Sequence, residues 1–240
     1  MDRTVSVVIP HRNEEAAEVD ATAQSFIDAG ADEVILIHDG DGNGPAWGRN
    51  QGAERSTGDV VCFSDAHVRW MEGDFKHFCL LSMRAVMVAP CADMDDPERA
   101  AYGADMVEDT EKPGYKLIPV YKPRTRTEAL YGSVYAIGKD ILKRVGGWPR
   151  TRSWGYNEQA MTMAIHAAGV PIYVDASCKI LHRFRERFPY SIESPMPMVN
   201  RMIAHRMFSD PKEWRERWEP LFSQHKDAWE VFNDDYPVTR

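Results

Sequence analysis

The sequence contains no long hydrophobic segment. No apolar run approaches the roughly 20 residues that a helix needs to span a bilayer, and the polar, charged start is unlike a signal peptide. We therefore expect no membrane association and a cytoplasmic location.

Cysteine is scarce, with four residues among 240, and these lie far apart in mostly apolar segments. They show neither the paired spacing of a zinc site nor the density of a disulfide framework. We expect reduced, mostly buried thiols at Cys62, Cys79, Cys91 and Cys178.

The chain also lacks an excess of positive charge. Its net charge of −8 argues against a surface that coats nucleic acid, although a local basic groove remains compatible with it. One local concentration of basic residues near the end of the chain predicts an anion site. Its members are His182, Arg183, Arg185, Arg187, Arg201, His205 and Arg206.

Apolar runs and amphipathic segments alternate in the first part of the chain. Residues 4–10 (TVSVVIP) and 33–38 (EVILIH) predict two buried strands. Between them, an apolar stripe that ends at Gly30 predicts a helix, with Asn13 as its cap and Glu14 in its first turn. This order, without an internal repeat or a convincing linker, indicates a single α/β domain.

Two later regions differ in composition. Residues 92–113 are acidic and polar, which predicts an excursion or mobile loop. Helical patterns return after residue 198, and the tryptophans of this tail are expected to be packing anchors rather than ligand platforms. These are Trp214, Trp218 and Trp229.

The stretch of residues 58–70 (GDVVCFSDAHVRW) ends a buried strand with polar side chains. Residues two apart in extended chain point the same way, so Asp65 and His67 project together beyond the strand. Open α/β sheets bind ligands at this end of their strands, and a cation held there suits a diphosphate. A lone D-x-H pattern is more often a turn cap followed by a loop histidine, so both interpretations stay open on these residues alone.

Three further motifs also have a structural interpretation beside a functional one. The glycine-rich residues 39–44 (DGDGNG) match neither the dinucleotide fingerprint nor the P-loop, and such a segment is most often a plain turn. His182 follows the last apolar run, where a histidine is more often a satisfied strand-end residue. Arg185 could equally be a solvated surface arginine.

Five stretches resemble, in the same order, the GT-A glycosyltransferases. The resemblance is family 2-like in the N-terminal half and strongest to the catalytic domain of the polypeptide N-acetylgalactosaminyltransferases, and it covers roughly residues 4–206. The D-A-H triplet and the spacing from His182 to Arg185 and Tyr190 are its specific parts. The stretches are VSVVIPHRNE, GRNQGAERSTGDVVCFSDAHV, GSVYAIGKDILKRVGGW, WGYNEQ and HRFRERFPY.

The resemblance implies a GT-A (Rossmann-like) single domain of the α/β class. Its central sheet is expected to be mixed and mostly parallel, flanked by helices and followed by a helical C-terminal tail. The expected glycosyltransferase domain spans residues 1–208, with a nucleotide-binding half at about 1–91 and an acceptor half at about 115–208. Residues 209–240 are expected to be a helical extension packed on it.

The resemblance also implies a metal site formed by Asp65, His67 and His182. Two imidazoles and one carboxylate suit a borderline transition ion better than Mg²⁺ or Ca²⁺, which prefer oxygen shells. We therefore expect Mn²⁺, with Mg²⁺ or another divalent ion as the alternative.

The same resemblance assigns a UDP-sugar site to the strand exits. Asp39 matches the aspartate that contacts the uracil and ribose, and Arg185 and Tyr190 match the loop that closes over the diphosphate. Arginine suits this task because its planar fork makes charge-assisted bonds to phosphate. The assigned donor-binding residues are Pro10, Arg12, Asp39, Arg49, Asp65, Ala66, Gly132, Arg185 and Tyr190.

Residues 154–158 depart from the family pattern. The N-acetylgalactosaminyltransferases carry W-G-G-E-N, whereas this sequence carries W-G-Y-N-E, so Asn157 stands where their sugar-contacting glutamate would be. Glu158 falls on the position of the general base in inverting family 2 enzymes. Trp154, Asn157 and Glu158 are thus the expected catalytic residues, and the departure leaves donor sugar and stereochemistry open.

The expected function is metal-dependent transfer of a sugar from UDP-GalNAc, UDP-GlcNAc or a UDP-hexose to an acceptor hydroxyl, with retention. The alternatives are an inverting enzyme with Glu158 as base and a non-catalytic protein that binds UDP-sugar. The acceptor could be a protein, a glycan, a small molecule or a modified nucleic acid.

Overall fold

The computed structural model describes residues 3–185, 189–192 and 194–235. Part of the predicted phosphate-binding loop, including Arg187, lies outside these residues, as does the end of the predicted C-terminal extension at 236–240. Within the described residues, no helix has the length and apolar character that crossing a membrane requires.

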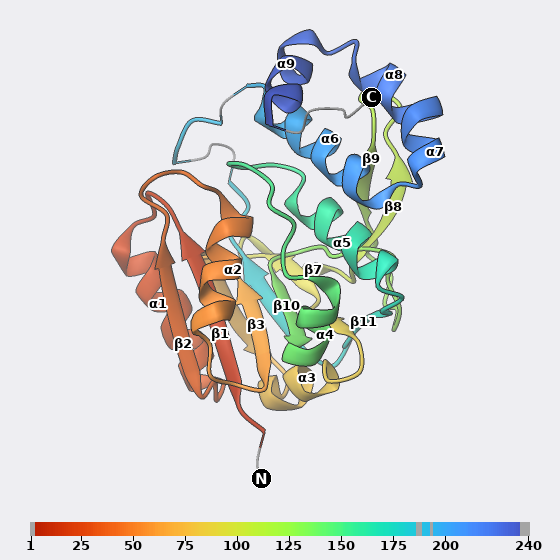
Figure 1. Ribbon diagram of the computed structural model, residues 1–240. Helices are drawn as coiled ribbons and strands as arrows, with labels where there is room; N and C mark the ends of the chain where they lie inside the picture. Colours follow the sequence, from red (N-terminus) through yellow and green to blue (C-terminus); the bar gives the residue numbers. More distant parts are fainter. Residues whose placement is uncertain (1–2, 186–188, 193, 236–240) are drawn as a thin grey trace.

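A six-stranded sheet forms the centre of the molecule, in the order β11-β5-β10-β3-β1-β2 (Figure 1). β10 is antiparallel to both of its neighbours, and the other three pairings are parallel. The prediction of a mixed, mostly parallel sheet is therefore confirmed. The strands are β1 (Val5–His11), β2 (Glu33–His38), β3 (Val60–Ser64), β5 (Val86–Val88), β10 (Val134–Gly138) and β11 (Ile172–Val174).

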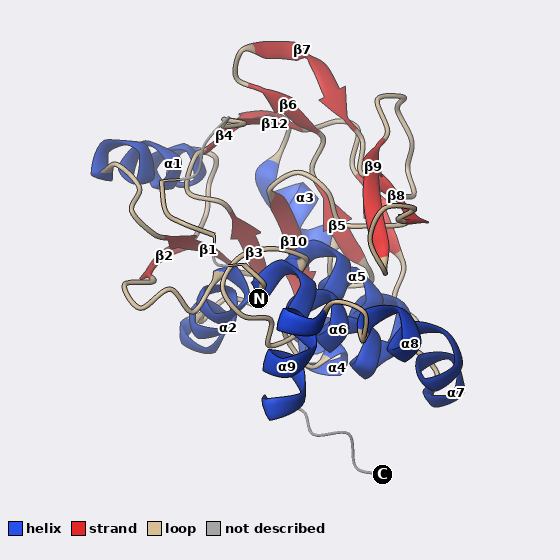
Figure 2. Ribbon diagram, turned by 90° about the horizontal axis from the view of Figure 1, so that it is seen from above, coloured by secondary structure: helices blue, strands red, loops and turns tan. Residues whose placement is uncertain are grey.

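Helices cover both faces of this sheet (Figure 2). Alternate side chains of β1 point to opposite faces, so Val5 and Val7 join one apolar cluster and Val8 joins another. The first cluster contains α1 (Ala16–Asp28) and α3 (Phe75–Leu81). The second contains α2 (Pro45–Arg55), α4 (Lys139–Val145) and α5 (Asn157–Ala167). This layered arrangement is the predicted α/β class.

Two smaller sheets include most of the residues that were expected to form an excursion or mobile loop. The first, in the order β4-β12-β6-β7, lies on the same side of the central sheet as α1 (Figure 2). The expectation of a mobile loop at 92–113 is wrong for most of these residues, because β6 pairs with β7 and with the distant β12, and β8 pairs with β9, which composition does not reveal. The strands are β4 (Val68–Glu72), β6 (Cys91–Asp93), β7 (Asp96–Ala101), β12 (Lys179–His182) and the hairpin β8 (Ala104–Glu108) with β9 (Tyr115–Pro119).

The C-terminal helices group together at one end of the molecule (Figure 1). Trp214 and Trp218 are buried in their shared core, and Trp229 packs against it. The prediction that these tryptophans are packing anchors is confirmed. The elements are α6 (Met196–Phe208), α7 (Pro211–Glu213), a π-helical turn at Trp214–Trp218, α8 (Glu219–Phe222) and α9 (Lys226–Asp235).

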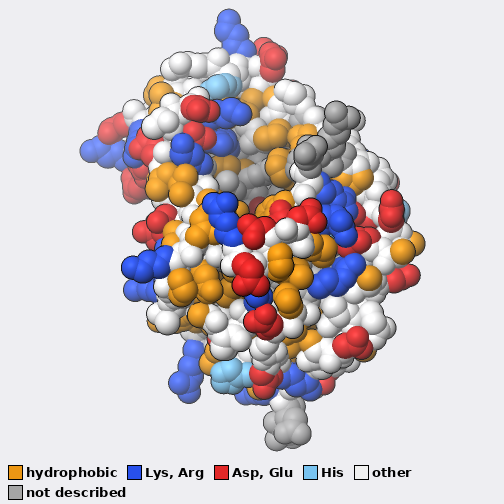
Figure 3. All heavy atoms as spheres, turned by 180° about the vertical axis from the view of Figure 1, so that it is seen from behind, with side chains coloured by type: hydrophobic (Ala, Val, Ile, Leu, Met, Phe, Trp, Pro, Cys, Tyr) orange, Lys and Arg blue, Asp and Glu red, His pale blue; other side chains and the backbone are white. Residues whose placement is uncertain are grey.

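The four cysteines are buried and free, as predicted. On the face drawn in Figure 3, the described acidic and basic side chains are intermixed. This agrees with the expectation that the protein is not generally basic.

His205 gives a testable acid sensitivity to the C-terminal core. Its ring is fully buried, stacks on Tyr115 and lies with Nε2 3.2 Å from the hydroxyl of Tyr156. Burial, helped by the positive charges of Arg201 and Arg217, lowers the pKa of His205 from 6.5 to about 3. The unfolded chain therefore binds a proton below pH 6.5 that the folded protein excludes until about pH 3, and stability falls as the pH falls through this window.

We expect His205→Gln to flatten this pH dependence. The wild type should lose about 3 kcal/mol between pH 6.5 and 4 through this group, because each unit of pKa difference corresponds to about 1.4 kcal/mol. Urea unfolding at a series of pH values measures the slope. His77→Gln, at an exposed position, should leave the slope unchanged. An equally steep slope in His205→Gln would contradict the prediction.

Candidate active site and cation site

A cavity of about 310 Å³ lies where the carboxyl ends of β1 and β3 meet the surrounding loops. Its volume falls within the range of small-molecule sites. The structure brings all of the predicted catalytic, donor-binding and metal-binding residues to its lining: Pro10, Arg12, Asp39, Arg49, Asp65, Ala66, His67, Gly132, Trp154, Asn157, Glu158, His182, Arg185 and Tyr190.

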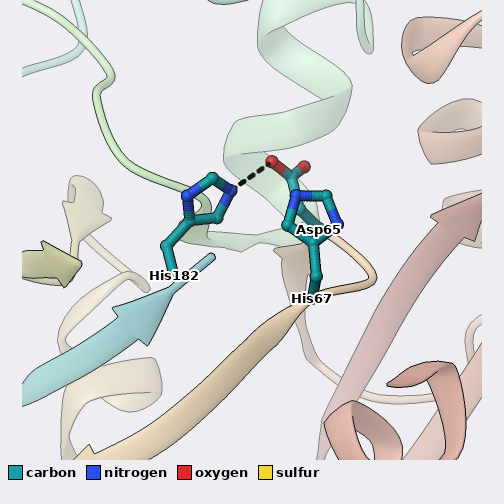
Figure 4. A group of neighbouring side chains, drawn as sticks. All are labelled: Asp65, His67 and His182. Carbon is teal, nitrogen blue, oxygen red and sulfur yellow. Dashed lines mark ion pairs between the residues drawn. The ribbon is translucent and has the colours of Figure 1, made fainter. Parts of the chain in front are cut away.

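Asp65, His67 and His182 converge at one end of this cavity (Figure 4). Asp65 follows β3, and His67 precedes β4. β12 pairs with β4 so that His182 lies opposite Val68, next to His67. One ligand atom from each residue lies within 4.8 Å of the others, and Nε2 of His182 is 3.6 Å from Oδ2 of Asp65. Sheet pairing thus joins residues that are over 100 positions apart.

The charge of Asp65 is fixed by its neighbours. Burial would raise the pKa of this carboxyl, but the contact with His182 and the nearby Arg49 charge outweigh burial and hold the pKa far below its usual range. Asp65 is therefore ionised at every physiological pH. In addition, Nδ1 of His182 is buried without a hydrogen-bond partner. One carboxylate and two imidazoles form a donor set that fits a divalent transition ion.

Arg49 joins the cation site to the predicted catalytic segment. Its side chain is only 2% exposed. Each of its terminal nitrogens donates a hydrogen bond of 3.0 Å, Nη1 to Glu158 and Nη2 to Asp65. The guanidinium also lies 4.1 Å from the centre of the Trp148 ring. Arg49 thus bridges two carboxylates in the cavity wall, and its predicted contact with a nucleotide stays a prediction.

Asp39 organises the glycine-rich loop. Its Oδ1 accepts a hydrogen bond from the backbone of Asn43 at 2.8 Å, and its Oδ2 accepts one from the backbone of Gly44 at 2.7 Å. Gly44 has a φ of +99° and packs against the carbonyl of Ser153, where a side chain would overlap it. The loop is therefore a tight turn, and Asp39 also lines the cavity.

The segment at 154–158 ends at the start of α5. Asn157 is buried, and its amide oxygen accepts a hydrogen bond from Thr151 at 2.5 Å. Tyr156 precedes it in the left-handed conformation, with φ 64°. Glu158 faces the cavity with 29% of its side chain exposed and is held by Arg49.

The predicted basic cluster is divided by the fold. His182, Arg183 and Arg185 line the cavity. The prediction of one anion site is wrong for the other described members, because α6 directs them toward the C-terminal core. Arg201 pairs with Asp109, His205 lies in the aromatic core, and Arg206 lies over Trp214.

Glu14 is the functional candidate that sequence reasoning missed. The expectation that Asn13 caps the helix and Glu14 occupies its first turn is wrong, because α1 begins at Ala16 and its N-cap is Glu15. Glu14 instead turns toward the cavity, where both of its oxygens accept bonds from Arg185. The other lining residues not predicted are His11, Gly44, Pro45, Ser153, Phe184 and Pro189.

The environment of Glu14 keeps its carboxylate charged. Burial alone would raise its pKa, but the contacts with His67 and Arg185 lower the pKa below its ordinary value. The only sequence signal was its place at the exit of the first strand, where a helix cap and a site residue look alike.

The Rossmann-like sheet and the Asp-His-His cluster at its strand exits define a GT-A fold protein. Residues 20–144, just over half of the chain, match the family model described as glycosyl transferase family 2. The chain therefore belongs to glycosyl transferase family 2.

Solved structures with the same fold include three glycosyltransferases. GalNAc-T7 with UDP, GalNAc and Mn²⁺ has a TM-score of 0.67 at 18% identity, and the match covers 96% of this chain and 54% of that one. This chain thus spans about half the length of that protein.

The other two structures are more distant. Drosophila β1,4-galactosyltransferase 7 with xylobiose has a TM-score of 0.54 at 11% identity, covering 80% of this chain and 77% of that one. The mannosyltransferase PcManGT from Pyrobaculum calidifontis, with GDP-Man and Mn²⁺, has a TM-score of 0.54 at 12% identity, covering 97% and 72%. At these identities the likeness concerns the fold.

Proposed function

We propose that the protein is a metal-dependent glycosyltransferase that moves a sugar from a UDP-sugar to an acceptor hydroxyl. The observation that carries this proposal is the convergence of Asp65, His67 and His182 on one cavity that Arg185 also lines. Membership of family 2 and the nucleotides and Mn²⁺ named for GalNAc-T7 and PcManGT support it.

Asp65, His67 and His182 would hold the cation, with Mn²⁺ as the proposed ion and Mg²⁺ or another divalent ion as the alternative. A divalent cation bound there supplies positive charge that stabilises the departing diphosphate. Arg185 would add charge-assisted hydrogen bonds to the same phosphate oxygens, because its guanidinium already sits at the cavity.

In the proposed reaction, the acceptor oxygen bonds to the anomeric carbon as the bond from that carbon to the diphosphate oxygen breaks. We propose retention, in which the hydroxyl attacks from the leaving-group face and its proton passes to a diphosphate oxygen. Glu158 then serves as a positioning group, in agreement with its ion pair to Arg49.

The inverting alternative stays open because Glu158 lines the cavity and is partly exposed. In that case its carboxylate takes the acceptor proton as general base. The donor sugar, the acceptor class, the division at residue 208 and the cytoplasmic location remain predictions from the sequence.

The decisive experiment incubates the protein with Mn²⁺ and each of UDP-GalNAc, UDP-GlcNAc, UDP-galactose and UDP-glucose, and measures the release of UDP with and without EDTA. We expect one donor to be consumed in a metal-dependent manner. Binding of UDP-sugar without any UDP release across an acceptor panel would favour the non-catalytic alternative.

NMR of the transferred sugar then decides the stereochemistry. An α-linked product from the α-linked donor agrees with retention. A β-linked product would end the retaining proposal and assign the base role to Glu158.

A further inference from the structure

Glu14 contacts both the candidate cation site and the arginine proposed to bind the diphosphate. Its side chain is only 6% exposed, although it comes from a loop between β1 and α1. Arg185 donates from Nη1 to Oε1 at 2.9 Å and from Nη2 to Oε2. The same oxygen, Oε1, also lies 3.5 Å from Nδ1 of His67. One buried carboxylate therefore contacts both a cation-site imidazole and the cavity arginine.

The Glu14 carboxylate faces one particular ring nitrogen of His67, which affects which nitrogen is available to bind a metal. Nδ1 of His67 is buried and has no hydrogen-bond partner, and the Glu14 carboxylate at 3.5 Å is an ion-pair contact slightly longer than a hydrogen bond. A proton on Nδ1 is favoured by this anion, which leaves the lone pair on Nε2. In Figure 4 one ring nitrogen of His67 faces the Asp65 carboxylate and the other points away from it.

We propose that Glu14 is a positioning residue that holds His67 in the tautomer and orientation required for cation binding, while it anchors Arg185 beside the same site. This inference rests on the proposed function, because it concerns the cation that Asp65, His67 and His182 would hold. Carboxylates that orient a ligating histidine typically change metal affinity by about 10- to 100-fold when they are removed.

The Arg185 contact explains why the carboxylate stays in place. The two-pronged ion pair fixes both oxygens of Glu14, so the oxygen facing His67 has little rotational freedom. When an anionic donor enters, Arg185 can exchange one of these bonds for a phosphate oxygen. The other bond then still holds the Glu14 carboxylate, so its contact with His67 persists when a donor binds.

The test measures Mn²⁺ binding without donor, from the electron paramagnetic resonance signal of free Mn²⁺. Glu14→Leu should weaken binding by about 10- to 100-fold. Glu14→Gln should show a smaller loss, because its amide oxygen still accepts a hydrogen bond but carries no charge. Glu15→Gln, at the exposed neighbour, is the matched control and should leave the affinity close to that of the wild type.

A second measurement reports on the ring itself. Nitrogen-15 shifts of the metal-free protein, with the His67 signals assigned from His67→Gln, should show the proton on Nδ1 in the wild type and a shift toward the other tautomer in Glu14→Gln. Because this measurement uses Glu14→Gln, it still tests the proposal if Glu14→Leu fails to fold.

The outcomes separate the two proposals. Wild-type affinity together with an unchanged tautomer in Glu14→Gln and Glu14→Leu would overturn the role of Glu14 and leave the glycosyltransferase proposal intact. Failure of the wild-type protein to bind Mn²⁺ would overturn the cation site of the proposed function, and this inference with it. An equal loss of affinity in Glu15→Gln would show that the effect is not specific to Glu14 and would also overturn its role.

Discussion

Asp65→Ala should abolish metal-dependent transfer while the protein remains folded. The substitution removes the only carboxylate from the candidate ligand set among the described residues and leaves two imidazoles. Loss of one preorganised group that stabilises developing negative charge typically lowers the rate by about 100- to 1000-fold, and loss of the cation itself should reach at least the upper figure. His182→Ala should have a comparable effect, because it removes a ligand from the opposite side of the site.

The measurement is the rate of UDP release at saturating Mn²⁺, with thermal unfolding in EDTA as the check on folding. Asp95→Ala is the matched control, since this carboxylate is exposed in a turn between β6 and β7 and does not line the cavity. A wild-type rate in Asp65→Ala would show that the assignment of the cation site is wrong.

Arg49→Met should produce the largest loss of stability. Arg49 is buried and is bonded to both Asp65 and Glu158, so its removal leaves two carboxylates in the cavity wall without their shared cation. Breaking a buried ion pair by removing one partner costs about 3–5 kcal/mol, and the partial exposure of both carboxylates favours the lower value. We therefore expect a loss of about 3 kcal/mol in the free energy of unfolding.

Urea unfolding at neutral pH in EDTA measures this loss. Arg55→Met lies in the same helix, α2, but is exposed, and it should stay within about 0.5 kcal/mol of the wild type. If the two variants were equally stable, the ion pairs of Arg49 would contribute little to stability, and its position in the cavity wall would depend on packing against Trp148 and Tyr135.

Local patterns were sufficient for the first strands of the central sheet, and the family resemblance supplied most of the cavity lining. β1, β2 and β3 are short, β-branched apolar runs, and their exits carry polar residues whichever way the rest of the chain folds. The i, i+2 geometry of extended chain places Asp65 and His67 on one side without reference to distant residues. The resemblance then supplied His182, which no local pattern connects to them.

Residues 92–113 show where local patterns were insufficient. Their acidic composition is typical of a loop, yet β6 and β7 form a hairpin that β12 joins through β6, and β8 forms a hairpin with β9. β7 and β8 pair their backbone groups while much of their side-chain surface stays in solvent, so they carry no continuous hydrophobic signature.

The sequence by itself thus determined the α/β class, the buried strands and the polar residues at their ends, since these depend on neighbours along the chain. Only the tertiary structure decided that Arg49 bridges Asp65 and Glu158, that α6 withdraws Arg201 and His205 from the cavity, and that Glu14 faces His67. Such choices depend on which charges meet across packed elements, and a buried charge is stable only beside the partner that the fold brings to it.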